Sequence, residues 1–200
     1  MSPDYSGGMS SHAGAVSVAF ADSALGLPRG VVQIAPATDA WARTFDDVRA
    51  AMAFDAPNAV VAIEHIGSTS VPGLAAKPIL DIGIGVRHTI RDGDVQDEIH
   101  DWLAGLGFVF RGDANDVRPD RMYGYELQPM IRLANLHVLV YGSQEWQYYI
   151  GFRDFLRAHP AERDAYRELK LNLSIQHPDD RIAYIGGKEA FIVERRARPA

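Results

Sequence analysis

The stretch EHIGSTSVPGLAAKPILDIGIGV, residues 64–86, decides the fold because it ends in a strongly alternating strand. Successive side chains of an extended chain point to opposite faces of a sheet. One face of 79–86 carries four apolar side chains: Leu80, Ile82, Ile84 and Val86. The other face carries only Asp81, Gly83 and Gly85. We therefore predict a strand that packs through one face and presents a single carboxylate on the other.

Helix-like and strand-like patterns alternate on both sides of this strand. The run VVAIEHI is β-branched and apolar, which is typical of a strand. Strand patterns occur at 60–66, 108–112, 122–128 and 135–142, and we expect the last two to pair antiparallel. Helical spacing of apolar residues occurs at 41–52, 95–106, 143–159, 161–176 and 184–192. The sequence thus predicts an α/β fold whose C-terminal third is helical.

Length and composition limit the classes of protein and of partner. The chain has 200 residues, no cysteine and a formal net charge of −6. The missing cysteine excludes disulfides, thiolate metal sites and a cysteine nucleophile, and the acidic balance argues against a nucleic-acid partner held by overall charge. No apolar run approaches the ~20 residues of a spanning helix, so we expect no membrane partner and a cytoplasmic location. We read 1–30 as a flexible N-terminal extension and 31–200 as one domain, of unknown oligomeric state.

The turn that follows the strand at 60–66 matches no standard nucleotide-binding motif. A P-loop would need a glycine where Pro72 stands, and a dinucleotide fingerprint would need one where His88 stands. The sequence GSTSVPG also lacks the Gly-x-Ser-x-Gly of a nucleophile elbow. Another kind of anion loop is therefore required.

The composition of the turn nevertheless favours an anion. Gly67 lets backbone N–H groups approach a ligand closely, and the hydroxyls of Ser68, Thr69 and Ser70 add donors. Lys77 can supply a full positive charge. Asp81 can then hold Mg²⁺ against a phosphate.

Several stretches resemble the GrpB family: HIGSTSVPGLAAKPILDI at 65–82, FRDFLRAHP at 152–160, Tyr166, LK at 169–170 and KEAFI at 188–192. The resemblance runs from about Val31 to Glu194. It implies a nucleotidyltransferase-like fold, in which a mixed β-sheet is flanked by helices. The family occurs alone and fused to dephospho-CoA kinase. In the nucleotidyltransferase superfamily a Gly-Ser turn binds nucleotide phosphates, and two carboxylates spaced Asp-x-Asp/Glu hold metal ions.

The chain departs from that pattern at two places. The second carboxylate would fall at Gly83, and the His-His-Leu-His run of relatives is reduced to 134–137, Ala-Asn-Leu-His, with only His137 retained. Two-metal transfer needs several carboxylates to hold ions ~4 Å apart. We therefore expect one Mg²⁺ ion or none, with Asp81 as the metal ligand.

The candidate site combines these residues with two arginines. We expect Asp81 to act as metal ligand or general base and His137 as an acid/base group or second ligand. Of the neighbours Glu64 and His65, which face opposite ways, His65 is expected to face the pocket. Arg153 and Arg157, one helical turn apart, are expected to bind the anion.

The ligand expected from this site is a nucleotide or another anionic or phosphorylated small molecule. Three functions stay open. The first is an enzyme, possibly a nucleotidyltransferase-like transferase; the second is a binding module that has lost catalysis, with Gly83 marking the loss. The third is a repurposed enzyme of a specialised pathway, in which Asp81 and His137 act without metal.

Overall fold

A computed structural model of the chain describes residues 11–21, 23–87, 93–113 and 120–196. Within these ranges, five strands form one mixed sheet in the order β2 (Val60–Ile66), β3 (Leu80–Val86), β7 (Ala134–Val140), β5 (Arg121–Tyr125) and β4 (Val109–Gly112). The pair β3–β7 is parallel, and the other neighbours are antiparallel. In the β3–β7 register Asp81 lies opposite Asn135, and Gly83 lies opposite His137. The predicted α/β fold with a mixed sheet is confirmed, as is the antiparallel pairing of β5 with β7.

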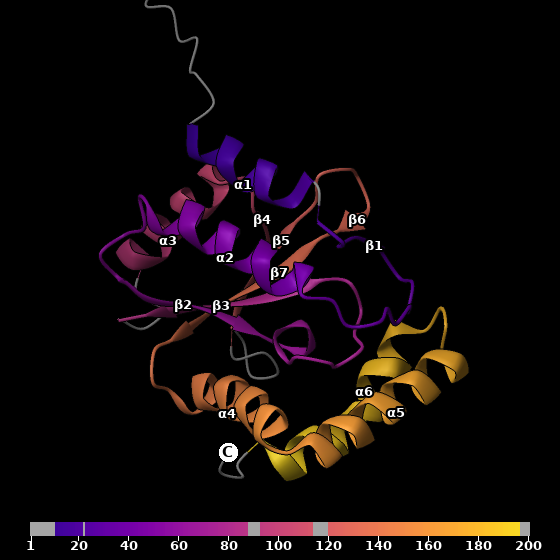
Figure 1. Cartoon of the computed structure of the whole chain (residues 1–200). Helices are drawn as coiled ribbons and strands as arrows, with labels where there is room; N and C mark the ends of the chain where they lie inside the picture. Colours follow the sequence, from indigo (N-terminus) through magenta and orange to yellow (C-terminus); the bar gives the residue numbers. More distant parts are fainter. Residues whose placement is uncertain (1–10, 22, 88–92, 114–119, 197–200) are drawn as a thin grey trace, which may run out of the picture.

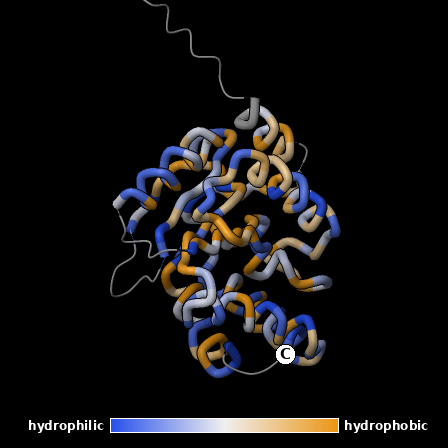
Figure 2. The backbone as a smooth tube through the Cα atoms, turned by 90° about the vertical axis from the view of Figure 1, so that its left-hand side faces the viewer, coloured by the Kyte–Doolittle hydropathy of each residue, from blue (hydrophilic) through white to orange (hydrophobic). Residues whose placement is uncertain are grey.

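One face of the sheet is covered by α1 (Ser11–Ala21), α2 (Ala40–Ala53) and α3 (Gly93–Gly105) (Figure 1). The main core lies between these helices and the sheet, and it contains Leu80, Ile82, Ile84 and Val86 of β3. Figure 2 shows hydrophobic colouring at the centre of the molecule and alternating colours along the outer helices. The alternation of β3 thus follows the prediction, with its apolar side chains on the helix-covered face.

We expected a flexible extension at the N-terminus. The described residues of this segment instead include a helix, α1, that packs on the core. Val16 and Phe20 of α1 are buried in the main core, and the Phe20 ring stacks on Tyr125 at 4.6 Å between centroids. A short strand, β1 (Leu27–Pro28), pairs with β6 (Ile131–Arg132). The helix escaped prediction because its apolar residues are mixed with Ala, Gly and Ser and do not form one stripe.

The C-terminal third consists of α4 (Gln144–Ala158), α5 (Pro160–Gln176) and α6 (Arg181–Arg195), as predicted. The Ser143 hydroxyl caps α4 by accepting from the Trp146 N–H at 3.2 Å. Pro160 starts α5 at a position where its missing N–H is not needed. These helices lie on the side of the sheet opposite α1 to α3 (Figure 1).

The glycines of β3 allow α4 to approach the second face of the sheet. A Cβ at Gly85 would lie 3.1 Å from the Trp146 ring, and one at Gly83 would lie 3.5 Å from it. The indole therefore covers both glycines and leaves the Asp81 end of the strand uncovered. Among the described residues, no helix is long and apolar enough to cross a membrane.

Candidate functional site

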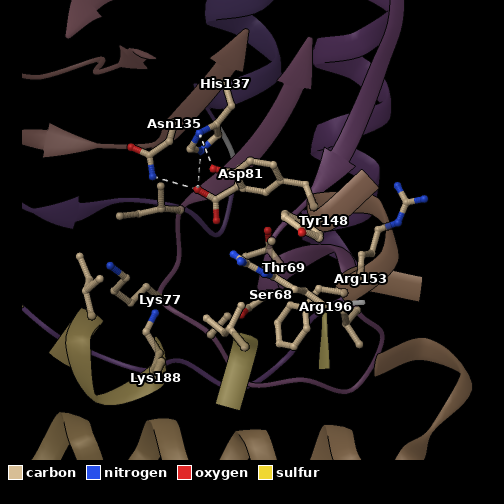
Figure 3. A pocket seen from close by; sticks show the side chains of 18 of the residues that line it. Ser68, Thr69, Lys77, Asp81, Asn135, His137, Tyr148, Arg153, Lys188 and Arg196 are labelled. Carbon is tan, nitrogen blue, oxygen red and sulfur yellow. Dashed lines mark hydrogen bonds and ion pairs between the residues drawn. The ribbon is translucent and has the colours of Figure 1, made fainter. Parts of the chain in front are cut away.

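A cavity of about 930 Å³ lies between the uncovered end of β3 and helices α4 to α6 (Figure 3). Its walls include the turn at 67–69, Asp81 of β3, Asn135 and His137 of β7, and side chains from all three C-terminal helices. Its size falls within the usual range of small-molecule sites. Of the predicted site residues, Gly67, Ser68, Thr69, Lys77, Asp81, His137 and Arg153 line it.

The turn is held together largely by its own polar groups. The Ser70 hydroxyl donates to the Gly67 carbonyl at 2.6 Å, and the Thr69 hydroxyl lies 2.9 Å from Nε2 of His65. Ser70 is buried and is not part of the cavity lining. The turn therefore offers fewer hydroxyl donors to a ligand than its sequence suggested.

Gly67 is required by two features of this turn. Its φ is +70°, and a Cβ there would lie 2.8 Å from Cβ of Asp81. Only glycine adopts that backbone freely. The turn thus packs directly against the carboxylate-bearing side chain.

His65 faces the opposite way from the expected one. Its ring is buried and stacks on Phe45 of α2 at 4.7 Å, while the other neighbour, Glu64, accepts from Arg153 on the cavity side. Burial, followed by the charges of Arg157 and Arg153, lowers the pKa of His65 to about 4 despite Asp81. The expectation is corrected because an aromatic neighbour in α2 and the Thr69 hydroxyl satisfy this imidazole.

The centre of the site is an imidazole between two carboxylates. Nδ1 of His137 contacts Oδ2 of Asp120, and its Nε2 lies 3.8 Å from Oδ1 of Asp81. Oδ1 of Asp81 also accepts from Nδ2 of Asn135 at 2.9 Å. Asp120 is buried, whereas the Asp81 side chain is 32% exposed. Figure 3 shows Asp81 between Asn135 and His137 at the wall of the cavity.

This arrangement favours the charged forms of both groups. Burial opposes the charge of His137, but hydrogen bonds and charges of Asp120 and Asp81 outweigh it and raise the pKa to about 9. Burial likewise opposes ionisation of Asp81, but His137, Asn135 and Lys77 hold the pKa of this carboxyl below its usual value. At neutral pH an imidazolium therefore lies between two carboxylates.

Asn135 is oriented by a group behind it. Its Oδ1 accepts from Nη1 of Arg132 at 2.9 Å, so its Nδ2 must point toward Asp81. Arg132 is itself bound to Glu126 through Nε at 3.1 Å and Nη2 at 3.0 Å. The Asp81 carboxylate is thus held from β7 and from the edge of β6.

The two predicted arginines have protein partners. Arg153 lines the cavity but donates to Glu64 at 2.7 Å and to Asp154 at 2.8 Å. Arg157 lies outside the lining, and its Nη2 donates to the Ser70 carbonyl at 2.7 Å. Arg157 therefore supports the turn from behind and is not placed to contact a ligand in the cavity.

All three lysines of the chain, Lys77, Lys170 and Lys188, line this one cavity. Lys170 is buried and donates to the Ala75 carbonyl, which makes it a support of the loop before β3. Nζ of Lys77 and Nζ of Lys188 lie 5.5 Å and 4.6 Å from the centroid of the same ring, Tyr184. Two ammonium groups therefore contact one aromatic ring (Figure 3 labels both lysines).

Burial and neighbouring cations act on these lysines together. Burial first, then the charges of Lys77 and Arg181, lower the pKa of Lys188 to about 8, against the attraction of Asp81. Burial and Arg181 also lower the pKa of Lys77. The wall formed by Lys77, Lys188 and Arg181 is therefore strongly positive and short of counter-charge.

The donor set does not fit a two-ion metal centre. Among the described residues, no group of three His, Asp or Glu side chains could hold a metal ion. A Cβ at Gly83 would lie 3.4 Å from Ile66 and 3.5 Å from Trp146, so the space for a second carboxylate is apolar. His137 already faces Asp81 as a cation, which leaves one carboxylate for any ion.

Sequence reasoning missed Asp120, Lys188 and Arg181. Asp120 stands at the end of a polar loop, where the start of a strand cannot be fixed to one residue. Lys188 and Arg181 stand two turns apart in α6, far along the chain from the turn. One signal was present: the chain carries 20 Lys and Arg residues, and only three of them are lysines.

The sequence of the chain is similar to a known family of proteins. Residues 31–198 match the family described as "GrpB protein". The chain is 32% identical to the UPF0157 protein YqkA of Bacillus subtilis over 165 residues, which cover 82% of this chain and 46% of YqkA. It is 30% identical to the glutamate-rich protein GrpB of Alkalihalophilus pseudofirmus over 171 residues, 85% of this chain and 97% of that protein.

A solved structure supports the same relationship. The crystal structure of the conserved protein GrpB from Enterococcus faecalis is similar to this fold with a TM-score of 0.69 and 30% sequence identity. The match covers 82% of this chain and 94% of that chain.

Proposed function

The chain belongs to the GrpB family, and from this premise we propose that it is an enzyme acting on a nucleotide or another phosphorylated small molecule. The substrate binds in the cavity between the turn at 67–69 and helices α4 to α6. Asp81 is the catalytic base. His137 holds Asp81 and balances its charge.

The observation that carries this proposal is the position of Asp81 in the cavity. Its carboxylate is 32% exposed to the cavity and lies beside the imidazolium of His137. The same cavity is lined by Lys77, Lys188 and Arg181. A fixed carboxylate facing unpaired cations suits a substrate that carries both an anionic group and a group that loses a proton.

Substrate binding adjusts Asp81 for this role. A carboxyl with a low pKa is a weak base, and Lys77 is one of the causes that lower the pKa of Asp81. An anion bound beside Lys77 cancels this part of the positive field and makes Asp81 a stronger base, while His137 and Asn135 still hold the pKa of its carboxyl below the usual value. Asp81 then accepts a proton from a hydroxyl or amine of the substrate, and the imidazolium keeps the oxygen in place.

The remaining expectations become parts of this proposal. The apolar space at Gly83, where a second carboxylate would stand, supports a reaction without a resident pair of metal ions. The net charge of −6 supports a small-molecule ligand rather than a nucleic acid. The cytoplasm remains the location we propose, and transferase chemistry remains the reaction class suggested by the fold.

A binding module without catalysis is the second candidate. The observation that favours it is the full engagement of His137 by two carboxylates, which leaves its ring with no free nitrogen. Such a protein would bind the same ligands with the same lysines. It would differ only in lacking turnover.

A thermal-shift screen with nucleoside phosphates and sugar phosphates, with and without Mg²⁺, tests the proposal. The ligands that raise the melting temperature are then incubated with wild-type protein, Asp81→Asn and Asp164→Asn, and products are followed by ³¹P NMR and mass spectrometry. Asp164 is the matched control because it pairs with arginines of α5 and is not part of the lining. We expect turnover that is lost only in Asp81→Asn. Binding without turnover in the wild type would favour the second candidate.

A further inference from the structure

We propose that Lys77, Lys188 and Arg181 bind the phosphate group of the substrate, and that this phosphate anchors the molecule while Asp81 acts on another part of it. This inference rests on the proposed function and names its ligand chemistry. From the sequence we expected the hydroxyls of the turn to bind the anion. The proposed anion site is instead the wall formed by α6 and the loop before β3.

These three cations have no ion-pair partner among the described residues. Among the residues that the structure describes, no carboxylate lies within ion-pair distance of Lys77, Lys188 or Arg181. Arg153, by contrast, is bound to Glu64 and Asp154, and Arg195 is bound to Glu162 at 2.6 Å. Lys77 and Lys188 are also half-buried, whereas Arg181 is exposed. An unpaired, half-buried ammonium group is unfavourable unless a ligand compensates its charge.

The three cations reach the same cavity from two segments of the chain. Lys77 comes from the loop before β3, whereas Arg181 and Lys188 lie two helical turns apart on α6, so both point from one face of that helix. Gly187 brings α6 close to α5, because a Cβ there would lie 2.5 Å from Cδ2 of Leu173. Gly187 therefore has a consequence for the site, because the close packing of α6 on α5 places Lys188 at the cavity wall.

The charge of the three cations favours a phosphate over a carboxylate. A phosphomonoester carries nearly two negative charges and three acceptor oxygens near neutral pH, which match two ammonium groups and one guanidinium. Burial first, and then neighbouring positive charges, lower the pKa of both Lys77 and Lys188, and such a dianion offsets those charges. A single carboxylate supplies about half of that charge and leaves two of the three cations uncompensated.

The phosphate and the reacting group of the substrate occupy different parts of the cavity. Asp81 is ionised in the same cavity, so a dianion is repelled from its immediate surroundings and favours the α6 wall. The cavity of about 930 Å³ leaves room beyond a phosphate for an organic group. Tyr148, Tyr149 and Phe152 line its remaining wall and suit an apolar or planar portion. The part of the substrate near Asp81 is therefore neutral or cationic.

Isothermal titration calorimetry at pH 7 and low salt tests the site, with inorganic phosphate, glycerol 3-phosphate and AMP as probes. We expect Lys77→Gln and Lys188→Gln each to weaken binding at least about tenfold. Arg167→Gln removes the same charge from α5 outside the lining and should leave the affinity within about twofold. Asp81→Asn should retain or tighten binding. If AMP alone binds, the organic group contributes to recognition; if all three bind, the phosphate suffices; either outcome supports the site when the lysine variants weaken it.

The folding of the variants supplies a second readout. Because the two lysines repel each other, Lys188→Gln should not lower the free energy of unfolding of the ligand-free protein, even though it weakens phosphate binding. Unchanged affinity in both lysine variants, or no binding of any probe by the wild type at about 10 mM, would overturn the assignment. Phosphate binding without turnover would overturn the proposed enzyme and leave this site standing.

Discussion

His137 and Asp81 face each other across the parallel pair β7–β3, with Nε2 of the imidazole 3.8 Å from Oδ1 of the carboxylate. The other side of the ring is bound to the buried Asp120. Asp120 therefore holds the imidazolium on one side, and Asp81, the candidate base, faces it on the other. This relationship leads to the first prediction.

His137 should stabilise the fold in a defined pH window. Its pKa is raised from 6.5 to about 9, so the stabilisation is complete below pH 6.5 and is lost as the pH rises through about 9. Lys188, with a pKa lowered to about 8, acts in the opposite sense between about pH 8 and 10.5. Lys188 is present in both the wild type and His137→Gln, so its contribution cancels when the two proteins are compared. We expect the wild type to lose roughly 2–3 kcal/mol more than the variant between pH 6 and 10 in urea unfolding.

The groups that face the ring are Asp120, Asp81 and Tyr149, the last with its hydroxyl 3.5 Å from Nδ1. The imidazole signals in ¹⁵N NMR spectra provide the direct check. A His137 ring that titrates at or below its ordinary value would contradict the assigned charge.

Gly67→Ala and Gly73→Ala should destabilise the protein by different amounts, although both positions have positive φ, +70° and +76°. At Gly67 the new Cβ lies 2.8 Å from Cβ of Asp81, whereas at Gly73 the nearest atom is Nη1 of Arg163 at 3.5 Å. Both variants lose about 1–2 kcal/mol from backbone strain. Gly67→Ala should lose at least about 1 kcal/mol more and should also displace Asp81. Equal losses in chemical denaturation would argue against the close packing of the turn on Asp81.

Substitution by alanine at the two adjacent glycines of α6, Gly186 and Gly187, should change the stability of the protein in opposite directions. Gly186 has no atom within 4 Å of a built Cβ, whereas Gly187 has Cδ2 of Leu173 at 2.5 Å. We expect Gly186→Ala to stabilise the protein by about 0.5–1 kcal/mol through helix propensity, and Gly187→Ala to destabilise it. Thermal unfolding measures both. Gly187→Ala should also weaken phosphate binding because it moves Lys188, and a variant that keeps full affinity would contradict that link.

Gly83→Asp should not create a metal site. The new side chain begins 3.4 Å from Ile66 and 3.5 Å from Trp146, so the carboxylate is buried against apolar groups. We expect a loss of stability larger than that of Gly83→Ala, by roughly 2 kcal/mol. Melting curves with and without Mg²⁺ give the readout. Stabilisation by Mg²⁺ that appears only in Gly83→Asp would show that one missing carboxylate is all that separates this chain from a metal centre.

The sequence predicted the part of the fold that depends on local periodicity. The alternation at 79–86 placed Asp81 on the face opposite the core, and the family resemblance identified the mixed sheet. Helix α1 was missed because Val16 and Phe20 are separated by small residues and become visible only when α2 and Tyr125 cover them. The orientation of His65 was missed because a strand presents either neighbour equally well, and the choice depends on Phe45 in a distant helix.

The site was predicted in part for a similar reason. Asp81, His137 and Lys77 lie near the turn or on its neighbouring strands; the sequence indicated them as candidates, and all three line the cavity. Asp120 and Lys188 reach the cavity only through strand pairing and helix packing, neither of which has a local sequence signal. Arg157 was expected to bind the ligand, but the Ser70 carbonyl accepts its hydrogen bonds.

Because all three lysines line the cavity, ¹³Cε-lysine labelling gives NMR signals that report on this cavity alone. The signals of Lys77, Lys170 and Lys188 can be assigned with Lys→Arg variants. We expect phosphate or AMP to shift the signals of Lys77 and Lys188 and to raise the pKa of Lys188 above its ligand-free value of about 8, while the signal of Lys170 stays nearly unchanged. Saturating ligand that leaves all three signals in place would contradict it.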